Sequence, residues 1–170
     1  MPKTWIDQKT AVIADSVYCD NNLCARDVAV TLPEIGFVTA DVQAMGTMTA
    51  AIVGLINDMT ASISKVGIDK AMFSLFSPGK HSFEVRGVQN SMSADGTSSP
   101  EGFKAFLSGM IATIPGLSVT PGSASENEIS ITVTRYQLYI GGEEMLCIDR
   151  LNGICRILGV DYYEQIAALL

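Results

Sequence analysis

Residues 129–170 read ISITVTRYQLYIGGEEMLCIDRLNGICRILGVDYYEQIAALL, and this stretch decides the fold class. Ile129, Ile131 and Val133 alternate with polar residues, which is the pattern of a half-buried strand. From Tyr136 onward the apolar positions shift by one residue, so the strand changes the face that it buries. A shift of one residue inside a strand predicts a β-bulge or a passage between two sheets.

The remainder of this stretch predicts short strands joined by tight turns. Gly141-Gly142 is a sequence typical of a two-residue hairpin turn. A return strand follows over residues 145–150, and Asn152-Gly153 marks a second turn before a strand at residues 154–158. The chain then closes on a predicted short helix, with Asp161 as its capping residue.

The first part of the chain also favours strands. Residues 11–17 and 23–32 flank Asp20-Asn21-Asn22, a good turn sequence, and together they predict an opening hairpin that ends at Pro33. Apolar and polar residues alternate again over residues 59–64, which predicts another half-buried strand.

Residues 37–57 have no regular pattern. Seven apolar residues lie here among small residues with almost no charge, and they fit either a buried helix or an apolar loop. These residues are Val42, Met45, Met48, Ile52, Val53, Leu55 and Ile56.

Residues 68–76 are the best helix candidate, because their apolar side chains fall on one helical face. Residues 82–89 and 103–112 follow as two predicted strands. The residues between them, 91–102, have the composition of a loop, so the two strands should form a long hairpin. A second loop, rich in Pro, Gly and Ser, is expected at residues 115–125.

The chain has 170 residues, which suffices for one domain with a sizeable core. We therefore predict a single mainly β (α+β) domain over residues 1–170. Charged residues make up only 17% of the chain, whereas about a quarter is usual. A chain with so little charge is expected to cover part of its surface by assembly.

The charge balance also restricts the partners. The formal net charge is −7 and no cluster of Lys and Arg occurs, which argues against a protein that grips nucleic acid. Residues 1–8 lack the apolar segment of a secretory signal. The longest apolar run, residues 50–56, is far shorter than the roughly 20 residues of a membrane-spanning helix.

The sequence predicts neither catalysis nor metal binding. His81 is the only histidine, and we interpret it as a surface or satisfied side chain. Asp149 near Glu143 and Glu144 fits solvated turn carboxylates better than a catalytic pair. We therefore expect no enzymatic activity, no cofactor and no metal. Four cysteines are interpreted as buried, reduced thiols: Cys19, Cys24, Cys147 and Cys155.

Residues 134–149, TRYQLYIGGEEMLCID, resemble the closing hairpin of the major tail tube proteins of contractile-tailed bacteriophages. R-type bacteriocins, which are headless tails, share this signature. Residues 30–33 resemble the family's first strand pair, and residues 59–67 and 69–76 resemble the strand and helix that follow. Leu158 departs from the family, where Asn is common. The resemblance rests most on Tyr136, Gly141, Gly142, Ile148, Asp149, Asn152, Gly153, Gly159, Val160 and Asp161.

The resemblance implies a small β-sandwich or barrel with one flanking helix. It also implies that six copies close into a hexameric ring whose inner strands form a continuous β-barrel around a lumen. Such rings stack into a tube inside a contractile sheath. The tube penetrates the cell envelope, and in a phage it conducts DNA without binding it specifically. The expected location is the tail tube of the virion, assembled in the host bacterial cytoplasm.

The resemblance further implies a set of protein partners. These are other copies of the chain, the tail sheath protein, the baseplate or initiator protein, the tail terminator and, during assembly, the tape measure protein. Two alternatives stay open. One is the tube of an R-type bacteriocin or another contractile injection system, through which no DNA passes. The other is a small-ligand-binding β-barrel or enzyme domain.

The family architecture assigns surfaces to segments of this chain. The closing hairpin spans about residues 127–150. The apolar segment at residues 41–58 is the expected contact between rings, although a folded-back core segment also fits. Asp69 and Lys70, in the helix at residues 68–76, are expected to face the sheath. One polar strand face is expected to line the lumen, although an ordinary solvent face fits equally: Glu126, Glu128, Ser130, Thr132 and Thr134.

Overall fold

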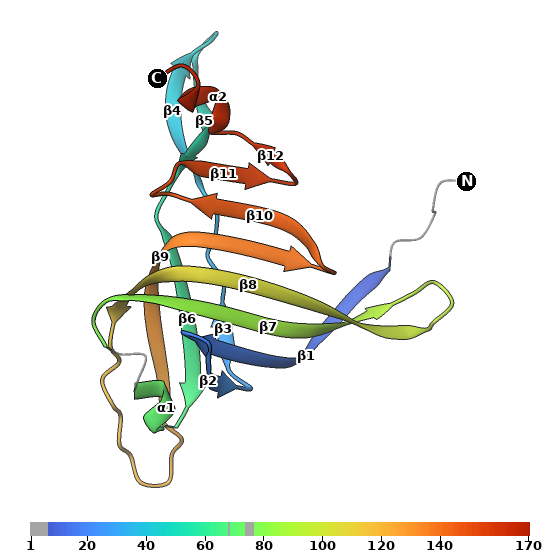
Figure 1. Cartoon of the computed structure of the whole chain (residues 1–170), viewed down its shortest axis with the longest axis vertical. Coiled ribbons are helices and arrows are strands. Elements are labelled where there is room, and N and C mark those ends of the chain that lie inside the picture. Colours follow the sequence, from blue (N-terminus) through green and yellow to red (C-terminus); the bar gives the residue numbers. More distant parts are fainter. Residues whose placement is uncertain (1–6, 68, 74–76) are drawn as a thin grey trace.

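The computed structural model describes residues 7–67, 69–73 and 77–170 (Figure 1). Twelve strands and two short helices make up this part of the chain. The first half contributes β1 (Gln8–Cys19), β2 (Asn22–Arg26), β3 (Ala29–Thr31), β4 (Phe37–Gln43), β5 (Thr47–Ile56), β6 (Met59–Val66) and α1 (Lys70–Phe73). The second half contributes β7 (Lys80–Met92), β8 (Ser98–Thr113), β9 (Glu126–Ile140), β10 (Glu143–Asp149), β11 (Ile154–Ile157), β12 (Val160–Asp161) and α2 (Glu164–Ala167).

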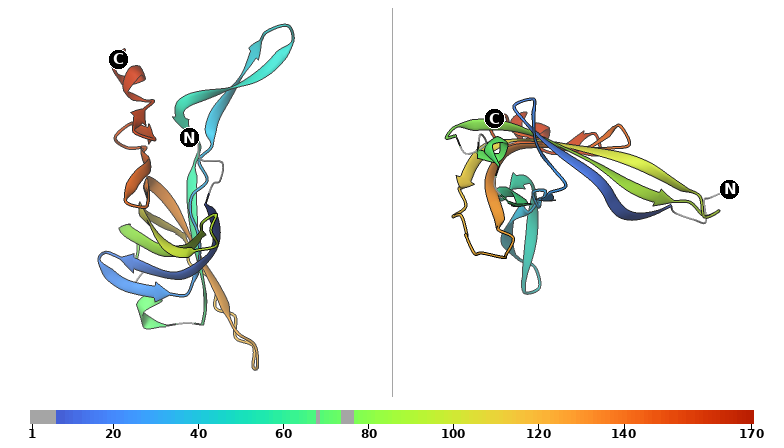
Figure 2. Two further views of the ribbon diagram at one scale, coloured as in Figure 1. Left: turned by 90° about the vertical axis from the view of Figure 1, so that its right-hand side faces the viewer. Right: turned by 90° about the horizontal axis from the view of Figure 1, so that it is seen from below.

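Ten of the strands form one antiparallel sheet. Eight of them follow one another in the order β12-β11-β10-β9-β8-β7-β1-β2. β6 also pairs with β9, and β3 pairs with β6, so the sheet branches. The sheet is strongly curved, as the right-hand view of Figure 2 shows. The prediction of a mainly β fold is confirmed. Over the described residues, however, the strands of a single chain do not close into a barrel.

The branch point lies in the middle of β9. Its first half, Glu126–Val133, pairs with β6, whereas its second half, Arg135–Ile140, pairs with β10 along the same edge. β8 runs along the other edge of both halves, with Ser108 opposite Arg135 and Gly109 opposite Val133. Thr134 is therefore an extra residue in β9. The predicted shift in burial is confirmed, and it combines a bulge with a change of neighbouring strand.

Hydrogen bonds hold Thr134 at this branch. Its hydroxyl donates to the backbone oxygen of Ser108 at 3.1 Å, and its backbone oxygen accepts from the Arg150 N–H at 3.0 Å. The bulged residue thus contacts β8 on one side and the end of β10 on the other. Its backbone oxygen thus has a hydrogen-bond partner although the regular ladder is interrupted.

One hydrophobic core fills the concave side of the sheet. Ile129, Ile131 and Val133 point into it before the bulge, and Tyr136 points into it afterwards. The other large core side chains are contributed by β1, β6, β7, β8 and β10: Val17, Met59, Ile63, Phe83, Leu107 and Ile148. Fully burying such a side chain stabilises the fold by about 1.5–3 kcal/mol. Both halves of β9 therefore serve the same core.

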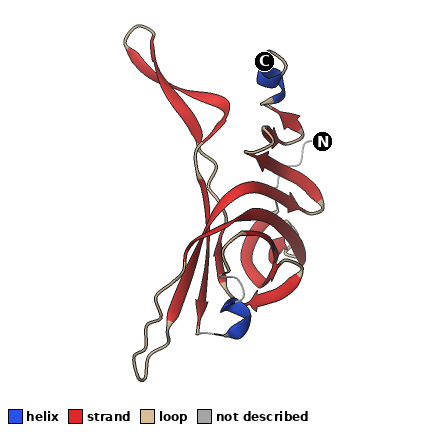
Figure 3. Ribbon diagram, turned by 60° about the vertical axis from the view of Figure 1, so that its left-hand side comes forward, coloured by secondary structure: helices blue, strands red, loops and turns tan. Residues whose placement is uncertain are grey.

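The apolar segment predicted as a buried helix or a loop is a β-hairpin, so this prediction is wrong. β4 and β5 pair from Phe37 and Ile56 to Gln43 and Thr47, and they project from the main sheet as an arm (Figures 2 and 3). Met45 and Gly46 form its tip with positive φ values of 53° and 125°. Most side chains of the arm are exposed on both faces. Its sequence therefore lacks the alternation that marks a strand with one buried face.

The loop predicted at residues 91–102 is also mostly strand. β7 continues to Met92 and β8 begins at Ser98, which leaves only residues 93–97 as the connection. The paired ends of β7 and β8 carry mainly polar and small residues, so the composition of residues 91–102 resembles that of a loop. The predicted hairpin between the two strands is nevertheless confirmed.

The two helices differ in part from expectation. α1 covers Lys70–Phe73, while Ile68 and residues 74–76 of the predicted helix lie outside the described residues. α2 is a second short helix near the C-terminal end, whose N-cap residue is Tyr163 rather than Asp161. The carboxylate of Asp161 instead accepts hydrogen bonds from the backbone N–H groups of Cys155 and Tyr163. Among the described residues, no helix has the length and apolar character needed to cross a membrane.

Gly109 provides a test of the bulge. A Cβ at this position would lie 2.3 Å from the backbone oxygen of Thr132, an atom that cannot move without disturbing the pairing of β8 with β9. We expect Gly109→Ala to lower the free energy of unfolding by about 2–3 kcal/mol in chemical denaturation. Gly102→Ala in the same strand meets open space and should change it by less than about 0.5 kcal/mol. Equal stability of the two variants would contradict this description of the bulge.

Candidate assembly surfaces

The β4–β5 arm carries the largest group of exposed apolar side chains that the sequence singled out. Met45 at its tip is fully exposed, and Val53 is 44% exposed. Val42, Met48, Ile52 and Leu55 are exposed as well, while Ile56 at the base is half-buried. The alternative of a folded-back core segment is therefore wrong for the arm itself. A lone two-stranded hairpin is only marginally stable in water, so an arm of this composition is a candidate surface for contact with a partner.

The base of the arm is fixed to the C-terminal segment. Gly54 is buried in β5, and a Cβ there would lie 3.0 Å from Ile166 Cδ1 and 3.3 Å from the backbone oxygen of Tyr162. Asp58, just beyond the arm, accepts a hydrogen bond from Arg150 at 2.7 Å. A cavity of about 220 Å³ lies between the base of β5 and the turn after β10. The position of the arm thus depends on the last strands and on α2.

Asp149 organises the turn after β10. Its carboxylate accepts hydrogen bonds from the backbone N–H groups of Leu151 and Asn152, both at 3.1 Å, and from the Asn152 amide at 2.7 Å. Nη1 of Arg135 lies 3.9 Å from Oδ2 of Asp149. Burial alone would raise the pKa of Asp149, but these hydrogen bonds and the nearby guanidinium outweigh it and hold the pKa below its usual value. The interpretation of Asp149 as a solvated turn carboxylate is wrong, because the residue is only 4% exposed.

Four other signature residues also have structural roles. Gly141 and Gly142 have φ values of 59° and 87° in the turn between β9 and β10, a conformation that suits glycine. Gly153 has a φ of 63°, and a Cβ there would lie 2.7 Å from the ring of Tyr163. Burial raises the pKa of Tyr136 to about 12. Each of these residues supports a turn or the core of the C-terminal half.

The polar face of the first half of β9 lies opposite the core. Glu126, Glu128 and Thr132 are exposed, whereas Ser130 and Thr134 are half-buried. Asn127, on the core side, is 3% exposed and donates a hydrogen bond to the backbone oxygen of Gly67. The structure therefore brings the five predicted lumen residues together on one accessible strand face.

The helix surface predicted to meet the sheath is accessible in part. Lys70 is exposed at the start of α1, and Asp69 is half-buried. Asp69 forms an ion pair with Lys65, which lies four residues earlier at the end of β6. Asp69 is therefore engaged within the chain, and Lys70 is the more accessible of the two.

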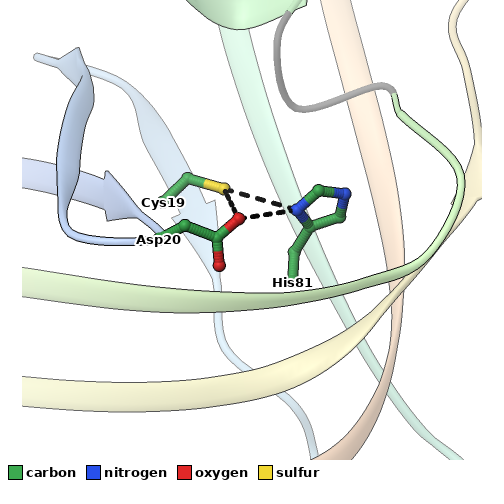
Figure 4. A group of neighbouring side chains, drawn as sticks. All are labelled: Cys19, Asp20 and His81. Carbon is green, nitrogen blue, oxygen red and sulfur yellow. Dashed lines mark hydrogen bonds and ion pairs between the residues drawn. The ribbon is translucent and has the colours of Figure 1, made fainter.

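Cys19, Asp20 and His81 form a cluster that the sequence did not predict (Figure 4). His81 Nδ1 lies 2.9 Å from Asp20 Oδ2 and 3.9 Å from Cys19 Sγ. The register of β1 against β7 places Cys19 opposite Phe83, two residues from His81. His81 is a satisfied and nearly buried side chain, which confirms one of the two interpretations offered for it.

The electrostatics of this cluster oppose nucleophilic catalysis by the thiol. Burial and the neighbouring carboxylate of Asp20 raise the pKa of Cys19 to about 12, so the thiol stays protonated near neutral pH. The hydrogen bond between Asp20 and His81 lowers the pKa of the carboxyl and raises that of the imidazole. All four cysteines are buried and free, as predicted.

Asp149 gives a prediction that depends on pH. Its folded-state pKa lies below the ordinary value of 3.8, so its charged form stabilises the fold fully above about pH 5 and loses this effect as the pH falls through the folded-state pKa. We expect Asp149→Asn to lower the free energy of unfolding by about 1–3 kcal/mol at pH 7. The difference from the unsubstituted protein should shrink in denaturation experiments below about pH 4.

The control for this variant is Glu143→Gln, which removes an exposed carboxylate from the preceding hairpin turn. It should leave stability within about 0.5 kcal/mol of the original value. A difference for Asp149→Asn that stays constant down to about pH 2 would show that lost contacts, rather than lost charge, cause the effect.

Comparison with known families agrees with these features. The family model described as phage tail tube protein FII matches residues 10–170, which is nearly the whole chain. Comparison with curated proteins gave no match. The matched range includes the arm, the branched strand β9 and all ten signature residues. The chain therefore belongs to the phage tail tube protein FII family, whose members are structural proteins of the virion that assemble with other tail proteins into a tube.

Proposed function

We propose that this protein is the subunit of the inner tube of a contractile phage tail, in which hexameric rings stack and enclose a channel for DNA. The main support is the combination of family membership with an apolar arm that projects from the subunit. The subunit itself has a structural role in this proposal, with no catalysis and no cofactor. The sheath, the baseplate or initiator, the terminator and the tape measure protein are its proposed partners in the tail.

Ring closure is supported by the open edges of the sheet. Within the described residues, the main path of the sheet ends at β12 and at β2, and β3 forms a further edge. Unpaired strand edges are available to strands of another chain. Pairing between neighbouring subunits would join their sheets into a closed inner barrel, which a single chain does not form.

Ring stacking is assigned to the β4–β5 arm. Its exposed apolar residues, including Met45, Met48 and Val53, would be covered by a subunit of the adjacent ring. The arm projects along the long axis of the molecule, away from the loop at residues 114–125 (Figure 1). Contact between rings along this direction would leave the sheet edges free for contact within a ring.

The channel wall is assigned to the polar face of β9, from Glu126 to Thr134. The chain has a formal net charge of −7, so a ring of six copies would carry six times that charge. A wall of this sign repels phosphate and lets DNA slide. The sheath contact is assigned to α1, with Lys70 as the accessible charge.

A reconstruction of assembled tails by electron microscopy tests these assignments together. We expect six subunits in each ring, the carboxylates of Glu126 and Glu128 at the channel surface, and α1 on the outer surface beside the sheath. A face of β9 that packs against another subunit would contradict the channel assignment. A helix α1 that points away from the sheath would contradict the sheath assignment.

Val53→Asp tests the arm. A charge at this exposed apolar position should leave the subunit folded, because its side chain is not part of the core, but should reduce tube formation at least tenfold, since burying an unpaired charge between rings is costly. Tubes would be counted by electron microscopy of negatively stained samples.

The matched control is Val119→Asp, which places the same charge on a valine that is 85% exposed in the loop at residues 114–125. It should form tubes at the original level. Undiminished tubes from Val53→Asp would rule out the stacking role of the arm.

A further inference from the structure

Three side chains with metal-binding atoms converge where the turn between β1 and β2 meets the start of β7. Cys19 Sγ lies 3.7 Å from Asp20 Oδ2 and 3.9 Å from His81 Nδ1, and the last two atoms lie 2.9 Å apart. Around a tetrahedral zinc ion, bond lengths of about 2.0–2.3 Å place ligand atoms roughly 3.3–3.8 Å from one another. The three atoms already have nearly this spacing, and Figure 4 shows that they face the same point.

The ring of His81 is oriented so that one nitrogen, Nδ1, faces the cluster. Nε2 lies 2.8 Å from the backbone oxygen of Ser77, which can only accept a hydrogen bond. Nε2 therefore carries a proton. Nδ1 is directed at Cys19 and Asp20 and donates a hydrogen bond to the Asp20 carboxylate at 2.9 Å, so a metal ion would displace this proton. A histidine that donates one ring N–H to a carbonyl while the other nitrogen faces the ligand site is the usual support of a metal-binding imidazole.

The other two ligands are also held in place. Asp20 Oδ1 accepts a hydrogen bond from the Ser82 N–H at 3.0 Å, which orients the carboxylate and leaves Oδ2 toward the cluster. The Asp20 N–H donates to the backbone oxygen of Ser82 at 2.9 Å. Cys19 and His81 are 5% and 8% exposed, whereas the side chain of Asp20 is about half exposed. The site is thus rigid on its inner side and open to solvent at Asp20.

We propose that Cys19, Asp20 and His81 form a zinc-binding site, with water from the open side as the fourth ligand. The ligand set selects the ion, because a thiolate and an imidazole suit zinc, whereas calcium and magnesium take oxygen ligands. Binding breaks the S–H bond of Cys19 and forms a Zn–S bond, and the proton is released to solvent. Where His81 Nδ1 is protonated, it releases a second proton in the same way.

Zinc at this site would join two segments that are far apart in the sequence. The turn after β1 and the beginning of β7 are separated by about sixty residues, and the ion would fix them to each other at the outer end of the sheet. An ion that binds the folded chain and not the unfolded one stabilises the fold by mass action. The site lies at the turn between β1 and β2, beside the β2 edge that is assigned to ring closure.

Titration of the purified, metal-free, full-length protein with Co²⁺ tests the site. Cobalt in such a site gives a thiolate-to-metal absorption band in the near ultraviolet and visible bands typical of tetrahedral coordination. We expect saturation at one Co²⁺ per chain, displacement by one equivalent of Zn²⁺, and a rise in Tm with Zn²⁺. Absence of the thiolate band with no change in Tm would overturn the proposal and leave the cluster as an ion pair between Asp20 and His81.

Variants separate specific binding from other effects. Cys19→Ser should abolish the thiolate band, whereas Cys147→Ser, which changes an equally buried free cysteine in β10, should keep it. Asp20→Asn covers the case in which Cys19→Ser fails to fold, because asparagine tolerates the φ of 47° at this turn position. It should weaken Zn²⁺ binding at least tenfold. A band that persists in Cys19→Ser, or unchanged Zn²⁺ affinity in Asp20→Asn, would overturn the site.

Discussion

The branch in β9 at Thr134 is the constraint on which the rest of the structure depends. One continuous strand pairs first with β6 and then with β10, while β8 follows it on the other edge. If Thr134 occupied a regular strand position instead of a bulge, strict alternation would turn Tyr136 away from the core and Arg135 into it. The bulge keeps both halves facing one core. The same edge of β9 thereby pairs with β6 before the bulge and with β10 after it.

The C-terminal segment fixes the base of the β4–β5 arm to the sheet. Asp149 and Asp161 each accept backbone hydrogen bonds that shape the turns around β11 and β12. Those turns place Tyr162 and Ile166 against Gly54 at the base of β5. Several residues of the family signature thus shape the turns that hold the arm. Through those turns, Asp149 and Asp161 help to fix the direction in which an apolar surface is presented.

The parts of the fold that follow from local sequence could be predicted, and those that depend on long-range register could not. The shift in apolar positions around Tyr136 and the Gly141-Gly142 turn correctly predicted the bulged strand and the closing hairpin. The β4–β5 arm was missed because a strand exposed on both faces lacks the alternation that burial produces. The cluster of Cys19, Asp20 and His81 was missed for another reason. It depends on how β1 aligns with β7 across about sixty residues, which the sequence of either strand leaves undetermined.

The composition of the arm has a consequence for the kinetics of tube growth. A two-stranded hairpin gains little stability on its own in water, and ordering its backbone costs roughly 1–2 kcal/mol per residue. If the arm contacts the next ring, as we propose, a subunit that joins an existing end recovers this cost at once through burial of Val53 and its neighbours. Two free subunits that meet in solution bury much less. Elongation would then be favoured over spontaneous initiation, and the length of a tube would be decided by where and when its first ring forms.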